Sequence, residues 1–181
     1  MTLIDFQDRI EKLNDDFMLY TSKKYLPTAE MIATYEKDKN LTFSDDVKEF
    51  LLTYGNLILE VNDDIWPKPQ EGDVLDSWKF GYGFFVYGLT TNDETPSWMD
   101  FEEKYAEQED DDAIEDGQLF FKRSGNLYKA YTNNGITTVD YGSFYDPDCE
   151  IFPGTIYDFL IAEIDKLEQD YIEYINQKTN S

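Results

Sequence analysis

Carboxylates are the most abundant chemically active side chains in this sequence. Its 181 residues include 39 Asp and Glu against 15 Lys and Arg, so the formal net charge is -24, and there is no histidine. Without histidine neither a Ser-His-Asp triad nor a Cys-His pair can form, and the common zinc sites lack their ligands. The chemistry left open is that of carboxylates, which bind Ca²⁺ or Mg²⁺ or hydrolyse glycosidic bonds in pairs.

The densest run of carboxylates, residues 110–117 (DDDAIEDG), is the best candidate for a metal site. An EF-hand loop needs oxygen ligands at its first, third, fifth and twelfth positions. If the loop starts at Asp112, Ile114 falls at the third position and Arg123 at the twelfth, so the pattern fails. We interpret the run as a solvated acidic loop, with a loose surface calcium contact as the alternative.

Two further motifs do not support catalysis. Residues 81–88 (GYGFFVYG) contain closely spaced glycines, but the segment reads as a strand with no helix after it, which a phosphate cradle would require. Cys149 is the only cysteine and has acidic neighbours. Because no histidine can activate it, we interpret it as a small buried or half-buried apolar group in a reducing compartment. We therefore predict a protein that is not an enzyme and that has no cofactor.

The charge favours a binding function. A negative surface repels nucleic acids and anionic lipids, whereas it attracts basic proteins and speeds their encounter. Aromatic side chains next to acids can anchor such a contact, although Trp66, Tyr82 and Trp98 could equally close the core over the sheet. Solubility alone is the other explanation of the charge. The predicted partner-binding residues are Trp98, Glu107, Glu109, Asp110, Asp111 and Asp112.

Apolar periodicity predicts helices at both ends of the chain. Apolar residues spaced by three and four predict a first helix over residues 3–20, and Thr28 can cap a second. Ser44 and Gly55 are expected to begin and end a third helix, with Gly55 in the left-handed conformation. Thr155 is the expected cap of a long amphipathic helix that closes the chain.

The middle of the chain has the pattern of strands. Segments 57–61 and 78–91 and three segments after Gly117 are rich in β-branched and aromatic residues, and Ser-Gly-Asn and Asn-Asn-Gly separate the last three as hairpin turns. A short helix is expected over residues 99–107. This order predicts an α+β fold in a single domain, residues 1–181. Its central, mostly antiparallel sheet is flanked by N-terminal helices and a long C-terminal helix.

Residues 28–59 (TAEMIATYEKDKNLTFSDDVKEFLLTYGNLIL) resemble the N-terminal signature of the SUKH superfamily, also called the Smi/Knr family. Ile32 and Glu36 match its first helix, and Phe50 to Asn56 match the core of its second. DGQLFF and NLYKAYT resemble its strand pair, and TIYDFLIAEI its closing helix. The resemblance is clearest over residues 28–167, and Thr42-Phe43 replaces the usual Leu-Pro.

The resemblance implies an α+β fold and a binding role, and its motif carries no catalytic residue. Bacterial members are immunity proteins that neutralise polymorphic toxins, often nucleases, and fungal relatives are regulatory scaffolds. We therefore expect an immunity protein, monomeric or homodimeric, that binds a basic toxin domain but neither nucleic acid nor membrane. The alternatives are a regulatory or scaffolding module for another cellular protein and a carboxylate-based enzyme or metal protein.

The sequence also predicts a cytoplasmic protein. The N-terminal segment, residues 1–17, is acidic and has no uninterrupted apolar core of the kind found in a secretory signal. No stretch approaches the apolar length of a membrane span.

Overall fold

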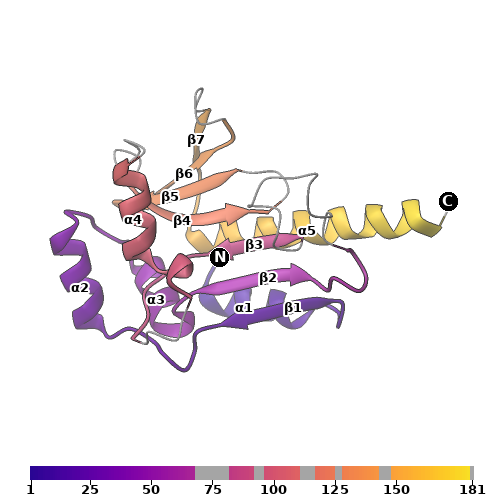
Figure 1. Ribbon diagram of the computed structural model, residues 1–181, viewed down its shortest axis with the longest axis horizontal. Coiled ribbons are helices and arrows are strands. Elements are labelled where there is room, and N and C mark those ends of the chain that lie inside the picture. Colours follow the sequence, from indigo (N-terminus) through magenta and orange to yellow (C-terminus); the bar gives the residue numbers. More distant parts are fainter. Residues whose placement is uncertain (68–81, 92–95, 111–116, 125–127, 143–147, 180–181) are drawn as a thin grey trace.

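The computed structural model describes residues 1–67, 82–91, 96–110, 117–124, 128–142 and 148–179. Within these ranges the chain forms five α-helices, one 3₁₀-helix and seven strands (Figure 1). In chain order the elements are α1 (Leu3–Glu11), β1 (Phe17–Thr21), α2 (Ala29–Asp38), α3 (Asp45–Tyr54), β2 (Leu57–Val61), β3 (Gly83–Val86), η2 (Ser97–Met99), α4 (Phe101–Asp110), β4 (Gln118–Arg123), β5 (Lys129–Asn133), β6 (Ile136–Asp140), β7 (Cys149–Phe152) and α5 (Ile156–Thr179).

The strands form one sheet whose order follows the chain from β1 to β7, and every neighbouring pair is antiparallel. Asn134 and Gly135 alone connect β5 to β6, and both have positive φ, 51° and 74°. That geometry belongs to the tight hairpin turn that matches strand twist. The predicted α+β fold with an antiparallel sheet and a long C-terminal helix is therefore confirmed.

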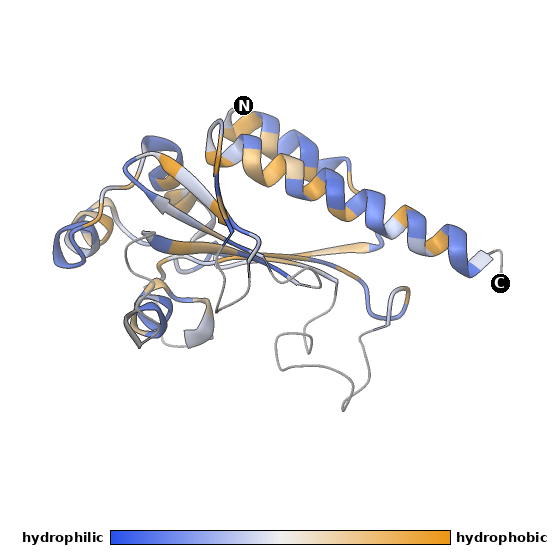
Figure 2. Cartoon of the chain, turned by 90° about the horizontal axis from the view of Figure 1, so that it is seen from above, coloured by the Kyte–Doolittle hydropathy of each residue, from blue (hydrophilic) through white to orange (hydrophobic). Residues whose placement is uncertain are grey.

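Helices pack on both faces of the sheet. Figure 2 shows α1 and α5 together on one side, while α4 lies on the other. A register shift between Leu119 and Phe121 lets two consecutive phenylalanines face the first side. Phe120 packs against Phe50 of α3 and Phe121 against Phe159 of α5, with ring centroids 5.9 and 4.8 Å apart. The core therefore lies mainly between the sheet and the helices α1, α3 and α5.

The first helix is shorter than its apolar spacing predicts. It ends at Glu11, and Phe17 begins strand β1, which pairs with β2. The side chain of Asn14 accepts a hydrogen bond from the Asp16 amide at 3.0 Å, and this local turn competes with helix continuation. The predicted helix over residues 3–20 is therefore wrong beyond Glu11, because strand pairing with a distant segment decides the conformation.

Helix α3 begins and ends where the sequence predicts. Ser44 is its N-cap residue, although its side chain makes no capping hydrogen bond. Gly55 ends the helix at φ 71° and ψ -72°, and the Asn56 amide donates to the Tyr54 carbonyl at 2.9 Å. The positive φ is confirmed, but the conformation is a γ-turn and not the left-handed helical one. A Cβ atom on Gly88 would lie 1.7 Å from the Gly55 carbonyl oxygen, so the two backbones cross closely here.

Helix α5 is fixed at its N-terminus by side chains from two elements. Thr155 accepts a hydrogen bond from the Asp158 amide at 3.2 Å, and Asp158 accepts one from the Thr155 amide at 2.9 Å. Asp46 of α3 accepts a further bond from the first helical amide, that of Ile156, at 2.7 Å. These acceptors satisfy amides that an α-helix leaves unpaired at its start, as the predicted Thr155 cap requires.

Candidate partner-binding site

The structure separates the predicted partner-binding residues. Trp98 is partly buried in η2 and packs edge-on against Phe85, with centroids 5.5 Å apart. Glu107 is exposed on α4 and pairs with Lys104 at 2.6 Å. The last two residues of α4 are Glu109 and Asp110, whose side chains are not described, and Asp111 and Asp112 lie outside the described residues. Neither Trp98 nor Glu107 lines either of the hollows described next.

The first hollow lies between α2 and the start of α4, with a volume of about 430 Å³. We call it the α2–α4 hollow. Ten described residues line it: Thr28, Glu30, Met31, Thr34, Tyr35, Asp38, Leu89, Thr90, Asp100 and Glu102. Four of the ten are carboxylates, and none is Lys or Arg. Figure 1 shows α2 and α4 at the same end of the molecule.

Burial and a single nearby lysine define the electrostatics of the α2–α4 hollow. Burial raises the pKa of Asp100, whose carboxylate also accepts a hydrogen bond from the Glu102 amide at 2.9 Å. Lys39 pairs with Glu102 at 3.0 Å and lies 4.5 Å from the centre of the Tyr105 ring. One lysine against four carboxylates leaves a surplus of negative charge. A lining of this kind attracts cationic groups.

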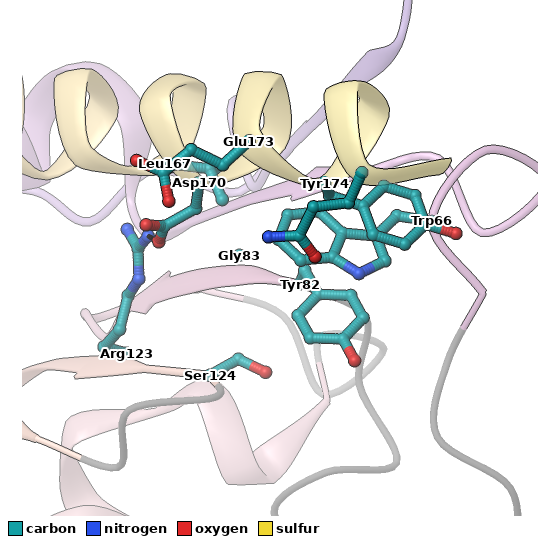
Figure 3. A pocket seen from close by; sticks show the side chains of 10 residues that line it. Trp66, Tyr82, Gly83, Arg123, Ser124, Leu167, Asp170, Glu173 and Tyr174 are labelled. Atoms are coloured by element: carbon teal, nitrogen blue, oxygen red, sulfur yellow. Dashed lines mark hydrogen bonds and ion pairs between the residues drawn. The ribbon is translucent and has the colours of Figure 1, made fainter. Parts of the chain in front are cut away.

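The second hollow, of about 310 Å³, lies under the C-terminal half of α5 (Figure 3). We call it the α5 hollow. Its described lining consists of Trp66, Tyr82, Gly83, Arg123, Ser124, Leu167, Asp170, Glu173, Tyr174 and Gln177. These side chains come from α5, from the ends of β3 and β4, and from the segment after β2. The hollow therefore depends on α5 extending well past its last fully buried residue, Leu167.

A buried ionic cluster forms one wall of the α5 hollow. Arg123 and Glu163 are 2% and 1% exposed, and their side chains lie 3.6 Å apart. Arg123 Nη1 donates to the Glu163 carbonyl at 3.0 Å, and Nη2 donates to Asp170 at 2.8 Å. Glu163 also accepts bonds from Lys166, at 2.8 Å, and from the hydroxyl of Tyr128. Burial, together with the Glu163 charge, raises the pKa of Tyr128, which keeps that hydroxyl a donor.

A stack of three aromatic rings borders the same hollow. Trp66 stacks on Tyr82 with centroids 3.9 Å apart and planes 16° from parallel. It also stacks on Tyr174, at 4.8 Å and 10°. One turn earlier in α5, Tyr171 packs against Phe17 at 5.3 Å and donates a hydrogen bond to Asp16. Tyr171 and Tyr174 are therefore both held by side chains from distant segments of the chain.

Sequence reasoning missed the α5 hollow as a site. In the sequence, Trp66 and Tyr82 are aromatic residues that could either anchor a contact or close the core, and Tyr174 is one of many tyrosines. Arg123 offered one further signal, because an arginine within a strand pattern between two phenylalanines and a turn is a candidate for a buried cation. None of these signals shows that residues so far apart in the chain meet.

Cys149 is exposed, so the expectation of a buried or half-buried cysteine is wrong, because the residue lies on β7, the last strand of the sheet. No group of three or more Cys, Asp or Glu side chains in the described ranges is arranged to hold a metal ion. Among the same residues, no helix has the length and apolar character needed to cross a membrane.

Comparison with known proteins adds no relative: no family model, curated protein or solved structure matches this chain. The resemblance to the SUKH superfamily therefore depends on the short motifs in residues 28–167. Beyond that resemblance, the function must be argued from the geometry of the two hollows.

Proposed function

We propose that this protein is a non-enzymatic binding module that acts as an immunity-type inhibitor of a basic toxin domain, for instance a nuclease. It would act in the cytoplasm of the producing cell. The observation that carries the proposal is the α2–α4 hollow, where Glu30, Asp38, Asp100 and Glu102 gather without a lining cation in a chain of net charge -24. The SUKH resemblance supports the same function.

The docking surface would extend from this hollow along α4. Asp100 and Glu102 line the hollow at the start of α4, and Glu107 is exposed on the same helix five residues after Glu102. Glu109, Asp110, Asp111 and Asp112 follow it in the chain. Of the predicted acidic residues, the proposal therefore places Glu107 beside the hollow, and the other four come after it in the sequence.

The mechanism would be electrostatic occlusion. A nuclease binds phosphates in a positively charged groove, and an acidic surface that docks in or beside it competes with the nucleic acid. Complementary charge raises the association rate, which falls with ionic strength because exposed charges are screened beyond about 10 Å at 0.1 M salt. Inhibition would then need no bond to be made or broken.

Co-expression with the toxin encoded by the neighbouring gene tests the proposal. The wild-type protein should rescue growth and form a complex whose association slows as salt is added. A triple variant, Glu30→Gln, Asp38→Asn and Glu102→Gln, should slow association about ten-fold at low salt and flatten the salt dependence. The control is Asp8→Asn, Glu11→Gln and Asp15→Asn, which removes the same charge from exposed positions elsewhere.

Two outcomes would count against this function. If the wild-type protein neither rescues growth nor forms a complex, the immunity function is lost and the regulatory or scaffolding module becomes the better hypothesis. If the triple variant and its control slow association equally, net charge alone attracts the partner and the α2–α4 hollow is not its docking site.

A further inference from the structure

The aromatic stack of the α5 hollow can receive a cation. Trp66 packs almost parallel to Tyr82 and Tyr174, so each tyrosine turns one ring face toward the tryptophan. The chain's own Lys178 already places its ammonium 5.9 Å from the centre of the Tyr174 ring. Aromatic ring faces attract Lys and Arg side chains because the face of the π system is negative. The stack is therefore chemically suited to a positively charged group.

The carboxylates of the hollow differ in how far they are already neutralised. Asp170 accepts a hydrogen bond from Arg123 at 2.8 Å. Arg123 also pairs with Glu163, which does not line the hollow and has Lys166 as a second partner, so these four charges compensate one another. Glu173 lines the same hollow, and the described residues give it one hydrogen bond, from the neutral amide of Gln169 at 3.1 Å. Glu173 is thus the surplus negative charge beside the aromatic stack.

We propose that the α5 hollow binds an arginine side chain presented by a protein partner. A guanidinium is planar and weakly hydrated, so it can stack on an aromatic ring while its fork of N–H groups donates to a carboxylate. Here the ring would be Tyr82, because Trp66 and Lys178 already cover the Tyr174 ring, and the carboxylate would be Glu173. A lysine ammonium would fit less well, because it cannot stack or donate two parallel bonds.

The proposal deepens the proposed function by naming the residue that a basic partner would insert, and for the identity of that partner it rests on the proposed function. The two hollows would then act together, with the α2–α4 hollow attracting the partner and the α5 hollow holding one side chain. The chemistry of the α5 hollow can nevertheless be tested without the partner.

The test is a titration of the full chain with acetyl-Gly-Arg-Gly-amide, followed through the tryptophan indole N–H signals in NMR spectra. The signal of Trp66 is identified by its loss in Trp66→Phe. The arginine peptide should shift this signal saturably, whereas the matched peptides with citrulline, which is neutral, or lysine should shift it much less. Glu173→Gln should weaken the arginine peptide about five- to ten-fold, and Glu11→Gln on α1 should not.

Three results would overturn the proposal: no saturable shift of the Trp66 signal, equal shifts with the arginine and citrulline peptides, or equal weakening by Glu173→Gln and Glu11→Gln. Equal binding of the lysine peptide would contradict the assignment to a guanidinium. The outcome is separate from that of the growth assay. If the arginine peptide binds at Trp66 but growth is not rescued, the α5 hollow is an arginine site and the immunity function is rejected. If growth is rescued but the peptide does not bind, the immunity function stands and the arginine site is rejected.

Discussion

Both hollows are lined by carboxylates, but the two differ in how many of these negative charges are paired with a cation. In the α2–α4 hollow four carboxylates share the lining with no cation, and Lys39 reaches only Glu102. In the α5 hollow a buried arginine, Arg123, lies between Glu163 and Asp170, and a stack of aromatic rings forms the opposite wall. The charge of the α2–α4 hollow is therefore only partly compensated, by Lys39. In the α5 hollow Arg123 is fully paired, Glu173 is the one surplus carboxylate, and the aromatic wall has a defined geometry.

This difference separates two contributions to recognition. Uncompensated surface charge acts over a distance comparable with the Debye length, so it raises the association rate and is sensitive to salt. A pocket with fixed rings and one surplus carboxylate acts only at contact, so it affects the dissociation rate and the choice of side chain. If the two hollows differ in this way, substitutions of their charged residues should also change the stability of the fold by different amounts.

The largest expected effect comes from the compensated hollow. Arg123→Leu removes the cation from a cluster in which Arg123 and Glu163 are 2% and 1% exposed. Glu163 would remain buried with Lys166 and Tyr128 but without the guanidinium, and its backbone carbonyl would lose a donor. Breaking a buried pair costs about 3–5 kcal/mol, and the partners that remain should keep the loss near the lower end of that range. Urea unfolding should show a loss of stability of that size.

Arg9→Leu is the matched control for Arg123→Leu. Arg9 also bridges two carboxylates, Asp165 at 2.8 Å and Glu168 at 2.6 Å, but these partners are largely exposed. Exposed pairs contribute roughly 0–1 kcal/mol, so Arg9→Leu should lose no more than about 1 kcal/mol. Equal losses for the two variants would show that burial of the Arg123 cluster does not matter.

Gly88→Ala tests the base of the α2–α4 hollow. A Cβ atom there would lie 1.7 Å from the Gly55 carbonyl oxygen, and the Gly88 carbonyl accepts a hydrogen bond from the Phe101 amide at the start of α4. The backbone must shift to make room, which costs about 1–3 kcal/mol. Gly135→Ala is the control, since its Cβ would meet only Ser44 at 3.7 Å and the strain comes from φ alone. A melting temperature lowered more by Gly135→Ala than by Gly88→Ala would contradict this account.

Elements with strong local signals can be predicted from the sequence. Ser44 and Gly55 bound α3 as expected, and the Asn-Asn-Gly sequence forms the turn between β5 and β6. Strand β1 is different, because Phe17 continues a helical spacing and adopts an extended conformation only by pairing with Val61 of β2. Long-range pairing of this kind is not encoded in a local pattern.

The two hollows show the same limit for the candidate site. The α5 hollow joins Trp66, Arg123 and Tyr174, which are more than 50 residues apart in the chain, and only the folded sheet and α5 bring them together. The carboxylates of the α2–α4 hollow look like ordinary solvated helix faces in the sequence. The binding function inferred from charge stays a prediction, and the geometry of the two hollows could not be predicted from the sequence.

Removing carboxylates should change stability by a smaller amount, and this change should differ between the two hollows. Glu30→Gln with Asp38→Asn removes two of the four like charges of the α2–α4 hollow, so repulsion falls and stability should rise by about 0.5 kcal/mol at low salt. The gain should disappear at 1 M salt, where screening acts within about 3 Å. Glu173→Gln should change stability little at either salt concentration. A gain that persists at 1 M salt would show that the two substitutions act through packing or helix propensity instead of charge.

The smallest expected effect is a difference in pH dependence between Asp100 of the α2–α4 hollow and Asp158, which caps the helix that roofs the α5 hollow. Burial raises the pKa of Asp100, so its charge opposes folding at neutral pH, and stability should recover as pH falls through that raised pKa. Hydrogen bonds from Thr155, followed by the α-amino group of Met1, lower the pKa of Asp158 to about 2. The Asp158 carboxylate therefore stabilises the fold above the ordinary pKa of 3.8, and this contribution is lost as pH falls toward 2.

Urea unfolding between pH 7 and pH 2 measures both contributions in Asp100→Asn and Asp158→Asn. An asparagine can still accept the capping hydrogen bond at either position, so the two variants differ from the wild type mainly in charge. Asp100→Asn should gain stability at pH 7 and converge with the wild type at acid pH, because the wild-type carboxyl is then protonated as well. Asp158→Asn should lose stability at pH 7 and converge only near pH 2. If the stability of the two variants relative to the wild type depends on pH in the same way, the environments of Asp100 and Asp158 do not differ in how they treat a negative charge.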